Sequence, residues 1–478
     1  MTEIIVIKPG EITLKSRRVR KRFEEKLVRN IKSALVRGGI GEFKIKVQRG
    51  RILLETPEVD RAFEILKRIF GISLLLIARR EKFKGIEDIV NRGEEIFRER
   101  VKGKKFAVRV KRTGFHRFRS MDVERALGGR LYRYSDGVDL TDPDELVELE
   151  VVDDVVYFVK RKERGAGGLP VGSEGKILLL FSGGFDSSVA FYLLMKRGLE
   201  VDLVSFIFGG ESQLRQVLSV AKEIADRYSY GYDPTFYAID FSEVIADIRK
   251  NVKESYRNII LKRQMLRSAN ALADEKGIIA VATGDSIGQV ASQTFDNLVI
   301  SSLASRKPII RPVVALDKQE IVDIARKIGI YERVSAIREY CQITPRHPVT
   351  HATVEGIERQ ERRIDLDLPL KLVSKRISFP ITKMEDVRML NYQIKPEEIP
   401  EDAVIFDIRD RNDFEEWHIP GSINIDEMEL YEKIGELDRE RIYVVACYRG
   451  GRSMALVSEM RKRGLKAYSL KGGCEAYR

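Results

Sequence analysis

The sequence predicts a multidomain protein that combines α+β segments with a doubly wound, parallel-sheet α/β segment. The chain has 478 residues, too many for one ordinary domain. Two stretches rich in Gly, Pro or acidic residues, 164–175 and 392–402, divide it into about three blocks, and the first stretch is expected to be an exposed connector. In the middle block strand-like and helix-like segments alternate, which is typical of a parallel sheet covered by helices.

The first block is predicted to be an α+β arrangement of two small subdomains. A strand-like run leads to a basic helix that ends at a Gly-Gly pair, and a similar set of elements starts at Leu74. The expected strands are 4–8, 43–47, 51–55, 105–111, 147–150 and 155–160, and the expected helices are 17–37, 59–69, 86–100 and 121–132.

The middle block is expected to form the doubly wound sheet, and the third block repeats its style on a smaller scale. In the middle block we expect strands at 176–181, 200–207, 235–240 and 278–283, and helices at 187–197, 212–228 and 257–276. In the third block we expect strands at 403–407 and 442–446.

Positive charge is concentrated in the first block. The chain carries a net charge of +12, and residues 1–170 contain 40 Lys and Arg against 27 Asp and Glu. Such a surplus indicates a polyanion as partner, although a solubilising surface has the same composition. No apolar run reaches membrane-spanning length, and the N-terminus lacks a basic-then-apolar leader. We therefore expect a soluble, cytoplasmic protein with no membrane partner.

The sharpest motif is Ser182-Gly183-Gly184-Phe185-Asp186-Ser187, between a predicted strand and a predicted helix. Backbone N–H groups and the positive end of the helix would meet there, which favours a phosphate, and the two glycines let the backbone approach it closely. Asp186 suits a phosphate only through Mg²⁺. The motif lacks the Gly-Lys-Ser or Gly-Lys-Thr of a Walker A loop, and a Gly-rich turn without a ligand is the alternative.

This loop resembles the PP-loop of ATP pyrophosphatases, which join AMP to a substrate oxygen and release pyrophosphate. Together with residues 262–267 (KRQMLR), 283–294 (TGDSIGQVASQT) and 339–341 (EYC), it resembles the tRNA 4-thiouridine synthase family, which is also linked to thiamine thiazole synthesis. The resemblance implies ATP and Mg²⁺ as cofactors, with no metal held by the protein alone, and Asp186 as a catalytic residue. A solvated helix charge is the alternative for Lys262. The implied ATP contacts are Leu180, Phe181, Ser182, Gly183, Gly184, Ser187, Ser205, Phe206, Lys262, Gly284 and Gln293.

The first block also resembles that family. Residues 8–15 (KPGEITLK) resemble its ferredoxin-like segment, with Ser16 where a Gly is often found, and residues 106–131 resemble a THUMP domain, an RNA-binding module. Cations there would hold phosphates while Phe115, His116 and Phe118 stack on unpaired bases. The resemblance implies recognition of the tRNA 3′ end, and a solvated basic strand and loop is the alternative. The expected RNA-binding residues are Arg109, Lys111, Arg112, Arg117 and Arg119.

Cys447 opens the segment CYRGGRS between an apolar strand and a predicted helix. Stacked N–H groups and Arg side chains are expected to lower the pKa of its thiol and to cradle an anionic sulfur. With residues 407–409 (DIR) and 418–422 (HIPGS), the region from about 400 to 478 resembles a rhodanese domain, whose loop cysteine carries a persulfide. A buried, inert cysteine is the alternative. The implied loop residues are Arg449, Gly450 and Arg452.

The other two cysteines have different expected roles. An odd total of three argues against a structural disulfide framework. By itself Cys341 is predicted to be a structural thiol, whereas the resemblance implies that it resolves the reaction through a redox-active disulfide with Cys447. Cys474 is interpreted as a packing residue. The sequence has no C-x-x-C pair and its four histidines are scattered, so we expect neither a protein-held metal nor an iron–sulfur cluster.

These resemblances cover nearly the whole chain. The domains they imply are ferredoxin-like (1–60), THUMP (61–165), PP-loop ATP pyrophosphatase with the doubly wound sheet (172–390) and α/β rhodanese (398–478). The implied activity is that of an ATP-dependent tRNA sulfurtransferase that makes 4-thiouridine, expected at uridine 8. ATP would adenylate the uridine O4, the Cys447 persulfide would attack C4, and Cys341 would release the thiolated base.

The implied partners are tRNA, a cysteine desulfurase as persulfide donor or free sulfide in its place, and a disulfide reductant. A homodimer and a role in thiamine biosynthesis are left open. Two alternatives remain: another PP-loop synthetase, either amide-forming or thiolating, and a non-enzymatic RNA-binding sulfur carrier. The paired RNA-binding and rhodanese-like segments argue against an amide-forming enzyme, and the complete S-G-G-F-D-S loop argues against a carrier.

Overall fold

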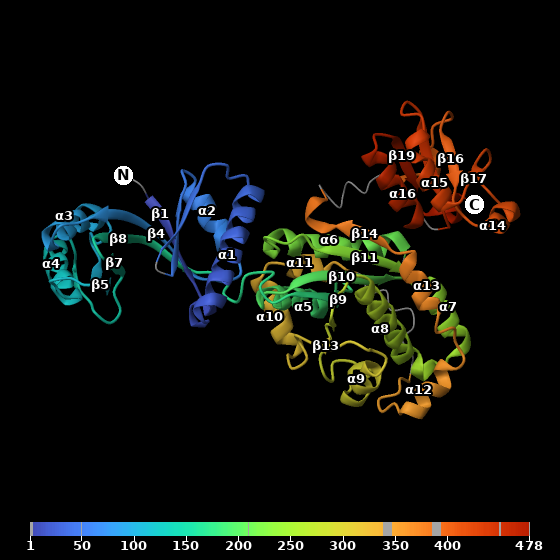
Figure 1. Ribbon diagram of the computed structural model, residues 1–478, viewed down its shortest axis with the longest axis horizontal. Coiled ribbons are helices and arrows are strands. Elements are labelled where there is room, and N and C mark those ends of the chain that lie inside the picture. Colours follow the sequence, from blue (N-terminus) through green and yellow to red (C-terminus); the bar gives the residue numbers. More distant parts are fainter. Residues whose placement is uncertain are drawn as a thin grey trace. The chain divides into compact units, whose positions relative to one another are not determined.

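The computed structural model describes residues 3–48, 50–208, 210–337, 347–384, 393–448 and 451–477. The chain separates into two compact units. The first unit comprises residues up to 174 with 196–198 and 230–232, and the second comprises the remainder. Within the second unit we call the part up to residue 384 the central body and the part from residue 393 the C-terminal body (Figure 1).

The first unit is built on one continuous eight-stranded sheet with the order β2-β3-β1-β4-β8-β7-β5-β6. Its strands are β1 (Glu3–Pro9), β2 (Lys44–Gln48), β3 (Arg51–Glu55), β4 (Ile72–Lys82), β5 (Lys105–Thr113), β6 (Gly137–Val138), β7 (Glu145–Val152) and β8 (Val155–Arg164). The helices are α1 (Arg17–Arg37), α2 (Val59–Leu66), α3 (Ile86–Phe97) and α4 (Ser120–Tyr132).

Three hydrophobic clusters lie on this sheet, and two of them include helix residues. One joins Phe23 and Leu27 of α1 to Phe63 of α2, and the other joins Phe97 of α3 to Leu127 of α4. The sequence predicts two small subdomains. In the structure the two cores that include helix residues lie on one sheet, and β4 is the strand that joins their halves. This strand is long enough to pair with β1 on one side and β8 on the other.

The stretch 164–175 is not the exposed connector that its glycines predict. Leu169 and Val171 are each only 2% exposed, and Leu169 belongs to the same core as Phe23. The Asn30 side chain donates a hydrogen bond to the Val171 carbonyl at 3.2 Å. The prediction failed because the glycines flank an apolar Leu-Pro-Val segment, and burial of that segment outweighs the flexibility of the glycines.

The central body is a six-stranded sheet with the order β13-β12-β9-β10-β11-β14. All neighbouring strands are parallel except the edge pair β11 and β14. The strands are β9 (Lys176–Leu180), β10 (Glu200–Ile207), β11 (Thr235–Asp240), β12 (Val281–Ala282), β13 (Ile309–Ile310) and β14 (Ile377–Pro380). The principal helices are α5 (Phe185–Lys196), α6 (Gly210–Tyr228), α7 (Ser242–Asn251), α8 (Arg257–Glu275), α9 (Phe295–Ser302), α10 (Lys318–Lys327), α11 (Tyr331–Ser335), α12 (Val354–Glu361) and α13 (Leu368–Ser374).

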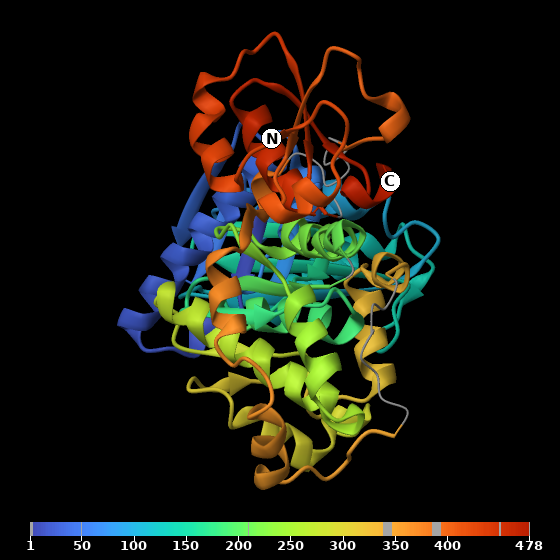
Figure 2. The same ribbon diagram turned by 90° about the vertical axis from the view of Figure 1, so that its right-hand side faces the viewer.

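The order of these strands creates a switch point at β9. From β9 the chain moves to β10 and β11 on one side, and then returns to β12 and β13 on the other. Figure 2 shows the helices around this sheet, and residues of α7 and α8 form one large core with strand residues such as Leu178 and Ile239. In doubly wound sheets, ligands bind at the carboxyl ends of the strands beside such a switch point.

The C-terminal body is a parallel five-stranded sheet with the order β15-β19-β18-β16-β17. Its strands are β15 (Gln393–Ile394), β16 (Val404–Asp407), β17 (Ile423–Asn424), β18 (Ile442–Ala446) and β19 (Lys466–Leu470), and its helices are α14 (Arg411–Glu416), α15 (Glu427–Lys433), α16 (Gly451–Lys462) and α17 (Gly473–Tyr477). Part of the second predicted connector therefore forms the edge strand β15. Through the described ranges of the chain, no helix is long and apolar enough to cross a bilayer.

Candidate functional site

The Ser182–Ser187 loop lies directly after β9, at the switch point. Ser182 Oγ and Ser187 Oγ are 3.1 Å apart, and the Gly184 N–H donates to Ser182 Oγ at 3.3 Å. Gly183 has a φ of +80°, and a β-carbon there would lie 2.8 Å from Ile337 Cδ1 and 3.2 Å from Val217 Cα. A larger residue at position 183 would thus be strained in its backbone and clash with its neighbours. The structure brings together the predicted loop residues.

Asp186 lies in the first turn of α5, where its carboxylate meets two polar side chains from other segments. Gln289 Nε2 donates to the carboxylate at 3.1 Å, and Lys318 Nζ lies 3.6 Å from it. Lys318 is the first residue of α10, whose N-cap Asp317 and Glu320 form a capping box. Sequence reasoning missed Lys318, although the cap motif D-x-x-E could have placed a lysine at the start of a helix.

Gly284 packs against the start of α5. A β-carbon at Gly284 would lie 2.6 Å from Ser187 N and 2.8 Å from the carbonyl carbon of Asp186. The next residue, Asp285, is buried, and its carboxylate accepts a hydrogen bond from Lys262 Nζ at 2.5 Å and from Thr283 Oγ1 at 2.7 Å. Burial alone would raise the pKa of Asp285, but Lys262, with Thr283 and Arg311, outweighs it and holds that pKa below its ordinary value. Lys262 is therefore fixed beside the loop.

The other expected ATP contacts border the same edge of the sheet. Ser205 and Phe206 are buried near the carboxyl end of β10, next to Leu180 at the end of β9 and to Phe181, which follows it. The Phe181 N–H donates to Val204 O at 2.8 Å. Gln293 ends the short helix 291–293, and its side-chain Oε1 is buried without a hydrogen-bond partner among the described residues. A buried amide oxygen without a partner is costly unless a ligand supplies a donor.

In the first unit, the expected RNA-binding residues lie on and after β5. Arg109, Lys111, Arg117 and Arg119 are exposed and Arg112 is half-buried. Phe115 is almost fully exposed, but His116 and Phe118 pack against Phe83, with ring centroids 6.1 and 5.9 Å from it. Of the three aromatic residues expected to stack on bases, only Phe115 is free to do so in this arrangement, because burial against Phe83 engages the others.

Lys111 also lines a cavity of about 320 Å³ within the first unit. Lys8 and Arg51 line it from β1 and β3, and both form ion pairs with the buried carboxylate of Glu150. Burial lowers the pKa of Lys8, in spite of the opposing effect of Glu150. The exposed basic residues of β5 thus adjoin a cavity whose lining includes Lys8, Arg51 and Lys111.

In the C-terminal body, Cys447 follows the central strand β18. Its side chain is buried, with Sγ 3.4 Å from Ser453 Oγ, which in turn lies 2.8 Å from Ser469 Oγ. Arg452 donates to Glu427 at 2.8 Å. The predicted loop residues Arg449 and Gly450 lie outside the described residues, as does Cys341.

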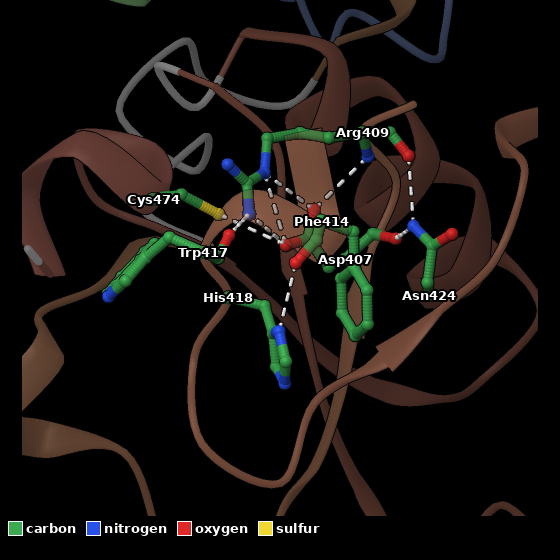
Figure 3. Close-up of polar contacts among 7 residues, drawn as sticks. All are labelled: Asp407, Arg409, Phe414, Trp417, His418, Asn424 and Cys474. Atoms are coloured by element: carbon green, nitrogen blue, oxygen red, sulfur yellow. Dashed lines mark hydrogen bonds and ion pairs between the residues drawn. The ribbon is translucent and has the colours of Figure 1, made fainter. Parts of the chain in front are cut away.

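The turn at the end of β16 contains a polar network centred on Asp407 and Arg409 (Figure 3). Arg409 donates from Nε and Nη2 to the buried Asp407 carboxylate, at 3.0 and 2.7 Å, and Nη2 also donates to the Trp417 carbonyl at 2.7 Å. The Asn424 amide donates to the carbonyls of both residues. This network links the carboxyl end of β16 to β17 and to the Trp417 backbone.

Cys474 lies on the same network. Its Sγ is 3.5 Å from Asp407 Oδ2, and its backbone N–H donates to the Cys447 carbonyl at 2.8 Å. Burial, with the nearby Asp407, raises the pKa of the Cys474 thiol to about 12. The structure therefore gives this cysteine the surroundings of a packing residue.

Four protein-family models match the chain: two in the first unit, one in the central body and one in the C-terminal body. They are the ThiI ferredoxin-like domain at residues 4–75, the THUMP domain at 83–159, the thiamine biosynthesis protein (ThiI) at 172–366 and the rhodanese-like domain at 395–478. The third spans the Ser182–Ser187 loop, Lys262 and Gln293, and the fourth spans Cys447.

Similar proteins cover between about three quarters and all of the chain. A tRNA sulfurtransferase of Desulfurococcus amylolyticus is 36% identical over 100% of this chain and 98% of its own. A probable tRNA sulfurtransferase of Saccharolobus solfataricus is 40% identical over 76% of this chain and 96% of its own. Among solved structures, a 4-thiouridine synthetase in complex with RNA and bound ATP is 29% identical, with a TM-score of 0.71 over 79% of this chain and 99% of its own.

Proposed function

We infer that this chain, which belongs to the tRNA sulfurtransferase family, uses ATP to adenylate a uridine of tRNA and then replaces O4 by sulfur. The product would be 4-thiouridine, expected at position 8 of the tRNA. The observation that carries this inference is the placement of the Ser182–Ser187 loop at the switch point of a doubly wound sheet, with Asp186, Lys262 and Lys318 gathered around it.

The first step would be attack of the uridine O4 on the α-phosphorus of ATP. An O–P bond forms, the bond between the α-phosphorus and the bridging oxygen breaks, pyrophosphate leaves, and the N3 proton of the uridine is released. The N–H groups of the loop and Lys262 would bind phosphate oxygens, while Gln293 Oε1, which lacks a partner, would meet a donor on the nucleotide. Lys318, whose Nζ lies near the Asp186 carboxylate, would offset negative charge there.

Mg²⁺ is expected to arrive with ATP, because carboxylate and phosphate oxygens are its preferred ligands. Asp186 fits such an ion, since its carboxylate is partly exposed at the phosphate loop, where it accepts from Gln289 and forms only a long, solvent-exposed ion pair with Lys318. The ion would neutralise phosphate charge. The positioning of ATP falls to Lys262 and the loop.

The second half of the reaction would use Cys447. A persulfide on Cys447 attacks C4, AMP leaves, and the base is joined to Cys447 through a disulfide. The thiolate of Cys341 then attacks the Cys447 sulfur, which frees the thiolated base and leaves a Cys341–Cys447 disulfide. Two electrons from a reductant restore both thiols. In support, Ile337, the described residue nearest before Cys341 in sequence, lies beside the phosphate loop, since a β-carbon at Gly183 would be 2.8 Å from Ile337 Cδ1.

The proposed reaction also needs tRNA and a sulfur donor as partners. The exposed cations of β5 and its following loop, from Arg109 to Arg119, would bind tRNA in the cytoplasm. A cysteine desulfurase would load Cys447, with free sulfide as the alternative donor, and the homodimer and thiamine roles are kept as hypotheses. We keep the domain limits 1–60, 61–165, 172–390 and 398–478 as working boundaries.

Analysis of tRNA nucleosides by mass spectrometry tests the proposal. Purified protein incubated with unmodified tRNA, Mg²⁺–ATP and sulfide should yield 4-thiouridine, with one pyrophosphate released per base modified. Omitting ATP should abolish the product. If tRNA gains no sulfur with ATP and either sulfide or a desulfurase present, the proposed function is wrong.

A further inference from the structure

A single buried carboxylate holds two cations beside the phosphate loop. Asp285 is 5% exposed and lies between Lys262 of α8 and Arg311, which follows the edge strand β13. Arg311 Nε is 3.3 Å from Asp285 Oδ2, and Arg311 Nη2 donates to Ser302 Oγ at 2.7 Å. Neither Arg311 nor Asp285 belongs to the residues that the sequence singled out for ATP.

The position of Arg311 follows from the sheet. Strands β12 and β13 are parallel neighbours, so their carboxyl ends reach the same edge, and the Thr283 N–H donates to Ile310 O at 3.1 Å. Gly284, next in the chain, is in van der Waals contact with the start of α5. Arg311 therefore lies on the same ligand-binding edge as the phosphate loop.

The charges of this cluster do not balance. The side chains of Lys262 and Arg311 are each 17% exposed, and among the described residues Asp285 is the one carboxylate that pairs with either of them. The second contact of Arg311 is a neutral hydroxyl, and its Nη1 has no partner in the described part of the chain. A largely desolvated surplus cation is unfavourable unless an anion accompanies it. An anionic ligand would supply the missing charge.

We propose that Arg311 is a phosphate-binding residue of the nucleotide site, which acts with Lys262 on the phosphates of ATP and on pyrophosphate, and that Asp285 positions both cations. The inference rests on the proposed use of ATP and adds a residue to that site. A guanidinium presents a planar fork that matches two phosphate oxygens, whereas the ammonium of Lys262 acts as a point charge. Asp285 keeps both donors from turning to solvent, so they are preorganised for the ligand.

A competing interpretation is that Arg311 only ties α9 to the strand edge through Ser302. The two interpretations differ in what they predict for ligands with and without phosphate. A phosphate-binding residue affects ATP and pyrophosphate but not adenosine, whereas a purely structural tie affects all three alike.

Isothermal titration calorimetry on the full chain distinguishes them, with ATP, pyrophosphate and adenosine as the three ligands. Arg311→Gln should weaken ATP and pyrophosphate by about 10- to 100-fold, the range for a lost charge-assisted hydrogen bond, and leave adenosine within about twofold. Arg311→Lys, which keeps the charge but not the fork, should give a smaller loss. Ser302→Ala is the control, since it removes the structural tie and should leave all three affinities unchanged.

The remaining outcomes of the titrations distinguish failure of this inference from failure of the proposed function. If Arg311→Gln leaves ATP unchanged, or weakens adenosine as much as ATP, the inference is overturned while the proposed function stands. If the wild-type chain binds no ATP, the proposed function itself fails. Should Arg311→Gln not fold, as judged by circular dichroism, Arg311→Lys decides, because an unchanged pyrophosphate affinity in that variant also overturns the inference.

Discussion

At the scale of single residues, the environment of each side chain separates reactive groups from packing groups. Asp186 is partly exposed and lies near one amide and one cation, whereas Asp285 is buried and engages two cations. The first can act on a ligand, while the second can only arrange other side chains. Cys447 and Cys474 are both buried, and their sulfur atoms lie against a serine hydroxyl and a carboxylate, respectively.

Replacing Asp186 or Lys318 should stop adenylation. Asp186→Asn removes the negative charge beside the loop and Lys318→Met the positive one, and each should lower tRNA-dependent pyrophosphate release by at least about 100-fold, the scale of one electrostatic contact in a transition state. Asp323→Asn, on the exposed face of α10, is the matched control and should stay near wild type. Pyrophosphate release above a tenth of wild type in both variants would contradict these roles.

Cys474 should make the stability of the C-terminal body depend on pH above neutrality. Its pKa rises from 9.0 to about 12 on folding, so the folded state binds the proton more tightly than the unfolded state, and stability is lost as pH rises between these values. The loss is at most about 1.4 kcal/mol per pH unit. Urea denaturation of wild type and Cys474→Val between pH 8 and 11 measures it.

The valine variant should show a shallower decline than wild type, because it cannot ionise. Iodoacetamide at pH 8 offers a second measurement, since a protonated thiol reacts slowly. Equal slopes for the two proteins, together with rapid alkylation of Cys474 in the folded chain, would show that its surroundings do not suppress the thiolate.

At the scale of elements, one buried ion triad ties α12 to α8. Glu361, at the end of α12, accepts from both Arg263 and Arg267 of α8, and Arg263 is itself buried. Burial would raise the pKa of Glu361, but Arg267 and Arg263 outweigh it and hold that pKa low. Because Lys262 is the neighbour of Arg263, this contact also steadies the helix that carries Lys262, which we propose to bind phosphate.

Glu361→Gln should destabilise the central body by about 3–5 kcal/mol, the cost of leaving buried charges without a partner. Glu358→Gln is the control on the same helix, since Glu358 pairs with Arg362 at the surface, and it should change stability by less than about 1 kcal/mol. Chemical denaturation followed by circular dichroism gives both values. A loss below 1 kcal/mol for Glu361→Gln would mean that the triad contributes little.

How far the sequence predicts these elements depends on the strength of their patterns. Strands Glu200–Ile207 and Thr235–Asp240 are found as predicted, because they are short, mostly apolar segments between helices. The edge strands β14 and β15 were not predicted, since they are short and lie in segments that contain or border prolines. The loop motifs can be recognised from the sequence alone. The cap motif places Lys318 at the start of a helix, but Lys318 and Arg311 reach the site only through tertiary packing, which no local pattern predicts.

At the scale of the whole molecule, the proposed binding of tRNA, use of ATP and transfer of sulfur fall to different bodies of the chain. The positive charge surplus lies in the first unit, the proposed nucleotide site in the central body, and the proposed sulfur-carrying Cys447 in the C-terminal body. The proposed reaction requires all three to meet the same tRNA.

Binding of tRNA should weaken steeply with salt through the first unit. Removing two phosphate contacts with Arg117→Ala and Arg119→Ala should reduce the slope of log affinity against log salt by about 2, given roughly 0.9 per contact. Arg92→Ala removes an exposed cation that pairs with Glu95 on α3, and it should leave the slope unchanged. Filter binding at several salt concentrations measures it. An unaltered slope in the double variant would place the RNA surface elsewhere.

A single turnover without reductant should leave a Cys341–Cys447 disulfide. Peptide mapping by mass spectrometry would find this bridge in the wild-type chain after incubation with tRNA, ATP and persulfide donor. Cys341→Ala should instead accumulate tRNA joined to Cys447, because no thiol cuts the adduct. A Cys341–Cys474 bridge, or full turnover by Cys341→Ala, would show that a different pair of cysteines acts.

The network around Arg409 has an optical consequence. Trp417, whose carbonyl accepts from Arg409, is the single tryptophan of the whole chain, and the guanidinium carbon of Arg409 lies 6.0 Å from its ring. Trp417 also shares the lining of a small cavity with Tyr448, the neighbour of Cys447. Emission excited at the red edge of indole absorption therefore reports on the C-terminal body alone, in the intact protein and without a label. We therefore expect the proposed loading of sulfur onto Cys447 to change this emission, which has no background from the rest of the chain.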